Sequence, residues 1–215
     1  MNSEPIQILS EPLGPPQTNC YAVRSGEHLW VIDAGIDPGP LLGVVRETGL
    51  QPEAILLTHA HYDHIAGIPE VRKAFPGIPV LVHEAEKEWL ETPELNLSAF
   101  AGPPVSLAPP DHCFRAGNRM RLGESEWLVI HVPGHSPGSV AFYCEAAKTT
   151  ISGDALFNGS VGRTDFPGCS IEQLAESIRT GLYTLPGETV VCPGHGPKTT
   201  IARERVHNPF VRAED

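Results

Sequence analysis

Basic residues are scarce in this chain. Its 215 residues include 15 Lys and Arg against 26 Asp and Glu, which gives a formal net charge of −11. A surface of this sign repels the phosphates of nucleic acids and of anionic membranes. We therefore expect neither nucleic acid nor a membrane as a partner. We expect the substrate to be a small molecule and the protein to be a monomer or a small homo-oligomer.

Paired cysteines and long apolar runs are also lacking. The five cysteines are scattered, odd in number and without a CxxC pair, which predicts reduced thiols rather than a disulfide framework. No apolar run approaches the length of a membrane-spanning helix. The N-terminal stretch MNSEPIQILSEPLGPP has no basic and apolar regions of a signal peptide. These observations predict a soluble, cytoplasmic protein.

Histidine is plentiful by comparison, with ten residues, and this excess indicates metal or acid–base chemistry. Hydrophobic residues make up 40% of the chain, enough for a sizeable core. The length fits one α/β domain, which we expect to span residues 1–215.

Both halves of the sequence alternate strand-like runs with helices. We expect strands at 6–10, 19–25, 28–35, 53–59, 78–84, 119–123, 126–134, 139–146, 149–157 and 188–196. We expect helices at 38–50, 69–77, 84–91 and 171–185, a long surface loop at 92–112, and a short tail after residue 196. The pattern predicts two β-rich halves packed face to face with helices outside.

The stretch LLTHAHYDHIAG carries the clearest chemical signal. His59, His61 and Asp63 are spaced at i, i+2 and i+4, so in extended chain all three point to one side. His64 follows where the chain must turn, and reaches from another direction. Neutral imidazole and carboxylate bind zinc and iron, and four such groups packed together without a metal would be costly. The cluster predicts a metal site.

Three further strand-like segments end in a potential ligand beside glycine: His135 in HVPGH, Asp154 in SGD and His195 in CPGH. Strand ends of this kind can converge on one point. The seven ligands exceed the needs of one tetrahedral ion and suit two divalent ions that share a carboxylate. Zinc is the first choice, with iron or manganese as alternatives.

The remaining histidines are expected to play structural roles. We interpret His28, His83, His112 and His207 as hydrogen-bonded core residues. His131 lies on the strand that leads to His135, and a role in supporting that ligand is as plausible as a plain core role.

These motifs resemble the metallo-β-lactamase superfamily: THAHYDH resembles its T-H-x-H-x-D-H signature, and PGH, GD and PGHG follow in the same order. The resemblance implies an αββα sandwich with the metal site at the sheet edges. The stretches HVPGHSPGS, GRTDFPG and PGHGPKTTI look most like the glyoxalase II (hydroxyacylglutathione hydrolase) branch in a short single-domain form. Only twenty residues follow His195, so we expect this chain to lack the helical domain that supplies much of that branch's glutathione site.

The resemblance also implies which residues bind each ion. His59, His61 and His135 would bind the first, Asp63, His64 and His195 the second, and Asp154 would bridge them. Metal-activated hydroxide would attack a thioester carbonyl, with S-D-lactoylglutathione or a related hydroxyacylglutathione as the expected substrate. Asp63 would orient the hydroxide as the catalytic residue. Arg163 and Lys198 are the candidate cations for an anionic substrate.

Other activities remain compatible with the same ligand types. Persulfide dioxygenases share GRTDF and hold one iron through two histidines and one aspartate. Hydrolases of lactones or other esters would use the same nucleophile. A purely structural metal domain is disfavoured, because structural zinc sites are closed cages of four ligands.

Overall fold

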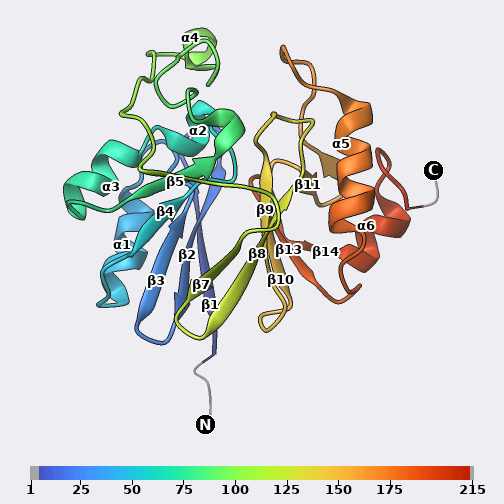
Figure 1. Ribbon diagram of the computed structural model, residues 1–215, viewed down its shortest axis with the longest axis horizontal. Coiled ribbons are helices and arrows are strands. Elements are labelled where there is room, and N and C mark those ends of the chain that lie inside the picture. Colours follow the sequence, from blue (N-terminus) through green and yellow to red (C-terminus); the bar gives the residue numbers. More distant parts are fainter. Residues whose placement is uncertain (1–4, 214–215) are drawn as a thin grey trace. The chain divides into compact units, whose positions relative to one another are not determined.

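The computed structural model describes residues 5–213, which divide into two compact units. Unit 1 runs to Phe114 and includes Arg121–Ser125, and unit 2 consists of Arg115–Met120 and the residues from Glu126 onward. Each unit is built on one six-stranded sheet (Figure 1). The single domain expected over residues 1–215 stays a prediction.

The sheet of unit 1 has the order β1-β2-β3-β4-β5-β6. Its strands are β1 (Gln7–Leu13), β2 (Thr18–Ser25), β3 (His28–Ile32), β4 (Ala54–Leu56), β5 (Val80–His83) and β6 (His112–Phe114). The first three pair antiparallel, whereas β3 to β6 pair parallel. Parallel strands end at the same edge of a sheet, so the segments that follow β3 and β4 emerge side by side, where ligands commonly bind.

Helices cover one face of this sheet (Figure 1). They are α1 (Gly39–Glu47) and α3 (Ile68–Ala74), and unit 1 also contains α2 (Tyr62–Ile65), the 3-10 turn η1 (Glu84–Glu86) and α4 (Ser98–Ala101). Leu41 and Val45 of α1 and Val71 of α3 are fully buried in the core of unit 1. This apolar anchoring fixes the chain around the strand ends.

The sheet of unit 2 has the order β14-β13-β10-β9-β8-β7. Its strands are β7 (Arg119–Leu122), β8 (Ser125–His131), β9 (Val140–Cys144), β10 (Thr149–Gly153), β13 (Val190–Pro193) and β14 (Thr199–Thr200). A small hairpin of β11 (Leu156–Phe157) and β12 (Ser160–Val161) follows β10. Helix α5 (Ile171–Ser177) continues into the π-helical turn η2 (Ile178–Leu182), and α6 (Ile201–His207) follows β14. Because β10 and β13 are parallel, they end at one edge.

Three expectations about local structure are wrong. The helix expected over 84–91 is only the turn η1, because the carbonyl oxygens of Trp89 and Leu90 beyond it accept hydrogen bonds from the Asn96 side chain and the Leu107 N–H. The loop expected over 92–112 contains α4. The tail after residue 196 contains α6. The Thr200 side chain caps this helix by accepting a hydrogen bond from the Arg203 backbone N–H, and the helix buries Ile201.

Glu204 of α6 organises the end of the chain. Its fully buried carboxylate accepts hydrogen bonds from the Gly159 N–H at 2.9 Å, the Thr199 hydroxyl at 2.6 Å and the Asn208 side-chain amide at 2.9 Å. The Tyr183 hydroxyl also contacts the Glu204 carbonyl oxygen at 3.0 Å. Glu204 therefore ties α6 to the β11–β12 hairpin, to β14 and to Asn208.

Replacing Glu204 by Ala should lower the free energy of unfolding by about 3 kcal/mol, because three buried donors lose their acceptor. Urea denaturation followed by circular dichroism measures this change. Glu176→Ala, at an exposed position of α5, is the matched control and should change stability by less than about 0.5 kcal/mol. Equal stability of the two variants would contradict the role assigned to Glu204.

All five cysteines lie within the described residues, and none forms a disulfide. Burial raises the pKa of the Cys20, Cys144 and Cys192 thiols, that of Cys192 to about 11, which keeps them protonated and unreactive at neutral pH. None of the helices within residues 5–213 has the length and apolar character needed to cross a membrane.

Candidate metal centre

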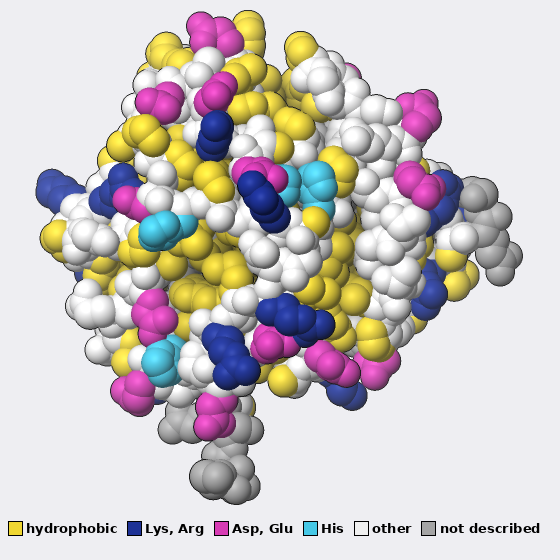
Figure 2. All heavy atoms as spheres, viewed as in Figure 1, with side chains coloured by type: hydrophobic (Ala, Val, Ile, Leu, Met, Phe, Trp, Pro, Cys, Tyr) yellow, Lys and Arg dark blue, Asp and Glu magenta, His cyan; other side chains and the backbone are white. Residues whose placement is uncertain are grey.

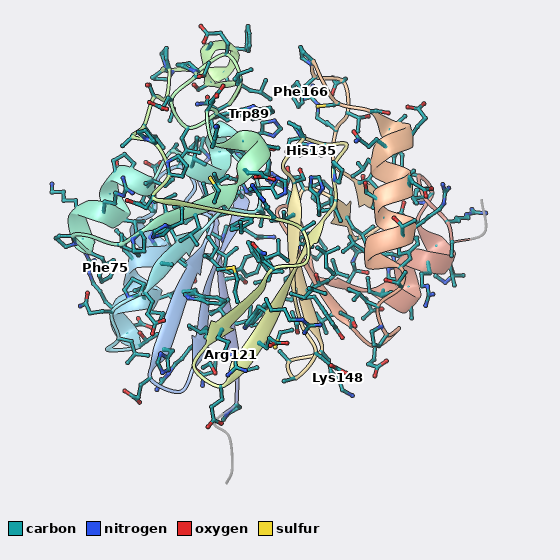
Figure 3. All side chains as sticks on the ribbon, in the orientation of Figure 1. Phe75, Trp89, Arg121, His135, Lys148 and Phe166 are labelled. Atoms are coloured by element: carbon teal, nitrogen blue, oxygen red, sulfur yellow. The ribbon has the colours of Figure 1, made fainter. Side chains whose placement is uncertain are left out.

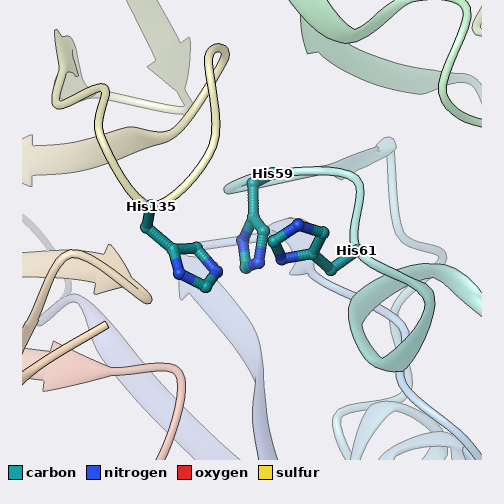
Figure 4. A group of neighbouring side chains, drawn as sticks. All are labelled: His59, His61 and His135. Atoms are coloured by element: carbon teal, nitrogen blue, oxygen red, sulfur yellow. The ribbon is translucent and has the colours of Figure 1, made fainter. Parts of the chain in front are cut away.

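The first histidines of the signature stretch extend from the segment that follows β4. His59 and His61 are both buried, with ring centroids 4.7 Å apart and planes nearly perpendicular (Figure 4). Ala60 lies between them and is also buried. The alternation of an extended chain therefore holds from His59 to His61, and each ring offers a nitrogen within 4.8 Å of the other.

The extended arrangement expected to continue through Asp63 is wrong. Helix α2 begins at Tyr62, so Asp63 and His64 occupy its only turn. This turn brings the His64 ring to 4.1 Å from that of His59, measured between centroids. A carboxylate oxygen of Asp63 lies 3.6 Å from His64 Nε2. The helix gathers the four side chains more tightly than an extended chain would.

Asp33, the residue that follows β3, holds His64 in position. The Asp33 carboxylate is buried and accepts hydrogen bonds from the Thr58 N–H at 2.8 Å, the Thr58 hydroxyl at 2.7 Å and His64 Nδ1 at 2.8 Å. A carboxylate with these partners accepts only, so His64 carries its proton on Nδ1. The lone pair of the neutral ring is then on Nε2, ready to bind a cation.

His59 is fixed in the same tautomer. The Thr58 hydroxyl gives its single proton to Asp33, so at 3.1 Å it accepts from His59 Nδ1. The lone pair of His59 therefore also resides on Nε2. One carboxylate thus sets the orientation of one histidine directly and of another through a threonine.

Asp63 is held by Thr18 of β2. The buried Thr18 hydroxyl donates to Asp63 Oδ2 at 2.8 Å and restricts rotation of the half-buried carboxylate. Tyr62 lies beside it in α2. Burial, and then the charge of Asp63, raise the pKa of the Tyr62 phenol, so this hydroxyl stays protonated and can donate a hydrogen bond at neutral pH.

The segment after β5 supports the histidine cluster from the other side. The buried Glu86 carboxylate accepts a hydrogen bond of 2.6 Å from the Ala60 N–H, and the Asn96 carbonyl oxygen accepts from the Tyr62 N–H at 2.9 Å. The indole of Trp89 lies over the His61 ring with centroids 5.7 Å apart. Three residues therefore brace the backbone and one ring of the signature stretch.

Unit 2 carries a second cluster, which begins with His135 in the loop after β8 (Figures 3 and 4). His135 is buried, and its Nδ1 lies 2.7 Å from the carbonyl oxygen of Arg163. Because a carbonyl only accepts, Nδ1 carries the proton and Nε2 the lone pair. The Cys169 thiol donates to the His135 carbonyl oxygen, so the loop is fastened at two points.

Asp154 and His195 complete this second cluster. Asp154 follows β10 and His195 follows the parallel strand β13, so both emerge at one edge. Asp154 Oδ2 lies 3.6 Å from His135 Nε2 and 3.4 Å from His195 Nε2. The buried carboxylate therefore sits between two imidazoles, and His195 itself is half-buried with 28% of its side chain exposed.

The donor set of the two clusters fits divalent metal ions. All seven predicted ligands are imidazoles or carboxylates, and each lies in one of the clusters: His59, His61, Asp63 and His64 in unit 1, and His135, Asp154 and His195 in unit 2. Three of the imidazoles have Nδ1 engaged by an acceptor, which is how metal-binding histidines are held. These His and Asp clusters are consistent with a binuclear metal site.

The residues suggested for substrate binding are on the surface. The Arg163 side chain is 69% exposed and forms a bidentate ion pair with Asp165, and its guanidinium lies 4.6 Å from the centre of the Phe166 ring. Its positive charge is therefore largely neutralised, and what Arg163 gives the site is its carbonyl oxygen. The Lys198 side chain is exposed. A role of either cation in binding substrate stays a prediction.

The other histidines lie largely where solvent reaches them. His83 is buried, as expected, and accepts a hydrogen bond from the Ala85 N–H. His28, His112 and His207 are exposed, so their expected place in the core is wrong. His131 donates from Nε2 to the Pro137 carbonyl oxygen at 2.8 Å, and thereby braces the loop that carries His135.

Gly162 allows the two parts of the second cluster to approach each other. A β-carbon at this position would lie 1.9 Å from the Asp154 carbonyl oxygen and 2.9 Å from His135 Nδ1. We predict that Gly162→Ala lowers the free energy of unfolding by roughly 1–3 kcal/mol and reduces bound metal, because the backbone of Asp154 and the side chain of His135 must both shift. Thermal unfolding and metal analysis measure the two effects.

Gly43→Ala is the matched control for this substitution. Gly43 lies in α1 with open space around it, so alanine there should stabilise the protein by roughly 0.5–1 kcal/mol. If Gly162→Ala bound as much metal as the wild type, the close approach of residue 162 to Asp154 and His135 would not be needed for metal binding.

Comparisons with known proteins agree with this arrangement. The profile described as Metallo-beta-lactamase superfamily matches residues 13–195. Probable metallo-hydrolase YqgX of Bacillus subtilis is 42% identical over 93% of this chain and 95% of its own. Hydroxyacylglutathione hydrolase GloC of Haemophilus influenzae is 32% identical over 97% of this chain and 99% of its own.

Two solved structures are also similar over nearly the whole chain. The BLEG-1 B3 metallo-beta-lactamase has a TM-score of 0.90 and 41% identity over 95% of this chain and 99% of its own. TTHA1623, solved in a di-iron-bound form, has a TM-score of 0.81 and 41% identity over 94% of this chain and 100% of its own. The predicted αββα fold is thereby confirmed.

Proposed function

Because the chain belongs to the metallo-β-lactamase superfamily and is a probable metal-dependent hydrolase, we propose that it hydrolyses a thioester with the help of two divalent metal ions. The first candidate substrate is S-D-lactoylglutathione or a related hydroxyacylglutathione. The similarity to a hydrolase named for this substrate class supports the choice.

The proposed ligands are the seven residues that the sequence indicated. His59, His61 and His135, drawn in Figure 4, would hold the first ion, and Asp63, His64 and His195 the second, with Asp154 between them. The observation that carries the proposal is the protonation pattern of His59, His64 and His135, each of which presents Nε2 as a lone pair. The di-iron-bound relative supports two ions, and zinc, iron and manganese all accept these ligands.

Two divalent ions would supply hydroxide near neutral pH and an electrophile for the carbonyl oxygen of the substrate. Asp63 would orient the nucleophile. Thr18 occupies one lone pair of Asp63 Oδ2, so the remaining acceptor positions of that carboxylate can hold a water proton. The protonated phenol of Tyr62, next in the chain to Asp63, is a candidate donor to the substrate.

The chemistry of a thioester suits this set of residues. A thiolate leaves without a proton, so the site needs no general acid beside the sulfur. The two ions, when bound by these ligands, would supply the hydroxide, and the thiolate would depart without a proton from the protein.

The test is thiol release from S-D-lactoylglutathione by purified protein loaded with metal. Wild-type protein should release thiol, His59→Ala should not, and His28→Ala should behave as wild type because that ring is exposed. No release by metal-loaded wild-type protein would overturn the proposed substrate.

Hydrolysis of β-lactams is a second candidate, favoured by the 41% identity to a protein described as a B3 metallo-beta-lactamase. Loss of the ultraviolet absorbance of a β-lactam in the same preparation tests it. Oxygen uptake with glutathione persulfide and hydrolysis of lactones test the two alternatives that the sequence left open.

The expectations about surroundings and assembly stay proposals. We expect a cytoplasmic monomer or small homo-oligomer that binds neither nucleic acid nor membranes. Size-exclusion chromatography with light scattering measures the oligomeric state.

A further inference from the structure

The segment between β5 and β6 places an aromatic ring against the histidine cluster of unit 1. We define residues 84–107 as the Trp89 loop. Within it, the half-buried indole of Trp89 lies over the His61 imidazole, with ring centroids 5.7 Å apart and planes 34° from parallel. A group that contacts the exposed part of this indole therefore lies close to a proposed metal ligand.

The Trp89 loop is held rigidly. The buried Asn96 side chain donates to the carbonyl oxygens of Trp89 and Val105, both at 2.9 Å, and accepts from the Ser98 N–H at 3.0 Å. The Ser98 hydroxyl accepts from the Val105 N–H at 2.8 Å. A ring whose backbone is fixed this way is ordered before a ligand arrives, which lowers the entropy cost of binding.

The composition of the Trp89 loop selects the kind of ligand. It carries five Glu and one Lys, a net charge of −4, and no Arg or His. Leu95 and Phe100 expose 40% and 78% of their surfaces. Figure 2 shows hydrophobic and acidic side chains over the region of α4. An apolar, uncharged group fits this surface, whereas a carboxylate would be repelled.

We propose that Trp89 and its loop form the acyl-recognition wall of the site and select thioesters whose acyl group is apolar and uncharged. The inference rests on the proposed function. The thiol portion of a glutathione thioester carries carboxylates, so the acyl group is the part of the substrate that fits the indole. Trp89 is then a specificity-determining residue, and longer aliphatic acyl groups are better substrates than the lactoyl group.

The experiment compares acetyl-, butyryl-, hexanoyl- and succinylglutathione with wild-type protein, Trp89→Ala and Trp89→Phe. For wild type, kcat/KM should rise about two- to fourfold per added methylene, and succinylglutathione should be the poorest substrate. Trp89→Ala should abolish the dependence on chain length, and Trp89→Phe should retain most of it. Because each variant is compared with itself across substrates, a smaller folded fraction does not alter the result. Phe210→Ala, at an exposed aromatic residue of unit 2, is the control and should keep the wild-type dependence.

A second measurement separates this inference from the proposed function. Calorimetry with S-methyl- and S-hexylglutathione, which are thioethers and are not hydrolysed, reports binding alone. Suppose that the hexyl compound binds more tightly than the methyl compound to wild type but not to Trp89→Ala, and that no thioester is hydrolysed. This result would support the role of Trp89 and overturn the proposed function. Three results would overturn the inference. The dependence on chain length could be unchanged in Trp89→Ala, succinylglutathione could be turned over as well as butyrylglutathione, or neither assay could show a preference.

Discussion

Replacing Asp154 by Ala is expected to lower turnover by at least about 100-fold and to reduce the metal bound per chain. Removing a partner that only supports a ligand already costs about 10–100-fold in affinity or activity, and Asp154 is proposed as a ligand to both ions. Its carboxylate lies within 3.6 Å of the Nε2 atoms of His135 and His195. Without it, these imidazoles would face each other across a site with less negative charge to offset two cations.

Metal content by inductively coupled plasma mass spectrometry and thiol release measure the two effects. The matched control is Asp165→Asn, which removes an exposed carboxylate of the same unit that is paired with Arg163. It should keep wild-type metal content and activity to within about threefold, as expected for a surface ion pair. Full activity of Asp154→Ala would rule out the bridging role.

Replacing Asp33 by Asn is expected to weaken metal binding by about 10–100-fold, although Asp33 is not itself a proposed ligand. Its three partners all donate: the Thr58 N–H, the Thr58 hydroxyl and His64 Nδ1. An amide has one accepting atom where the carboxylate has two. If its NH2 group faces His64, the proton of that ring must move to Nε2, which removes the lone pair that would bind metal.

Competition with a chromophoric chelator measures the affinity of this variant. Asp37→Asn is the control, because Asp37 is exposed and Asn tolerates its positive φ of 56°. It should bind metal as the wild type does. If Asp33→Asn also bound metal as tightly as wild type, the tautomer of His64 would not depend on Asp33.

The candidate ligands could be selected from the sequence because metal binding demands a few residue types. Histidine and aspartate at i, i+2 and i+4, followed by further His and Asp residues at three other strand ends, form a combination that a plain core or turn does not need. The arrangement of the signature stretch was harder to predict, since α2 is a single turn that replaces the extended chain after His61. A four-residue helix leaves no periodic pattern to detect.

The supporting residues could not be predicted in the same way. Asp33 lies 31 positions from His64, Thr18 lies 45 positions from Asp63, and Glu86 lies 26 positions from Ala60. Threonine, glutamate and aspartate are common types, and only the pairing of strands brings these to the cluster. The one available signal was an aspartate directly after the strand HLWVI, ahead of Ala-Gly.

Arg163 has a partner that the sequence did make visible. Asp165 follows two positions later in GRTDF and forms the bidentate ion pair with the guanidinium. The guanidinium is thus paired at the surface, while the Arg163 carbonyl oxygen fixes the tautomer of His135. The contact that Arg163 makes with a proposed ligand therefore comes from its backbone, whereas the sequence drew attention to its side chain.

The most direct test of the central claim is an anomalous difference map from a crystal of the metal-loaded protein. The proposed centre predicts two peaks about 3.5–4 Å apart. His59, His61 and His135 should surround the first, Asp63, His64 and His195 the second, and Asp154 should contact both. A single peak, or peaks bound by the residues of only one cluster, would contradict the claim that the two clusters together form a binuclear metal centre.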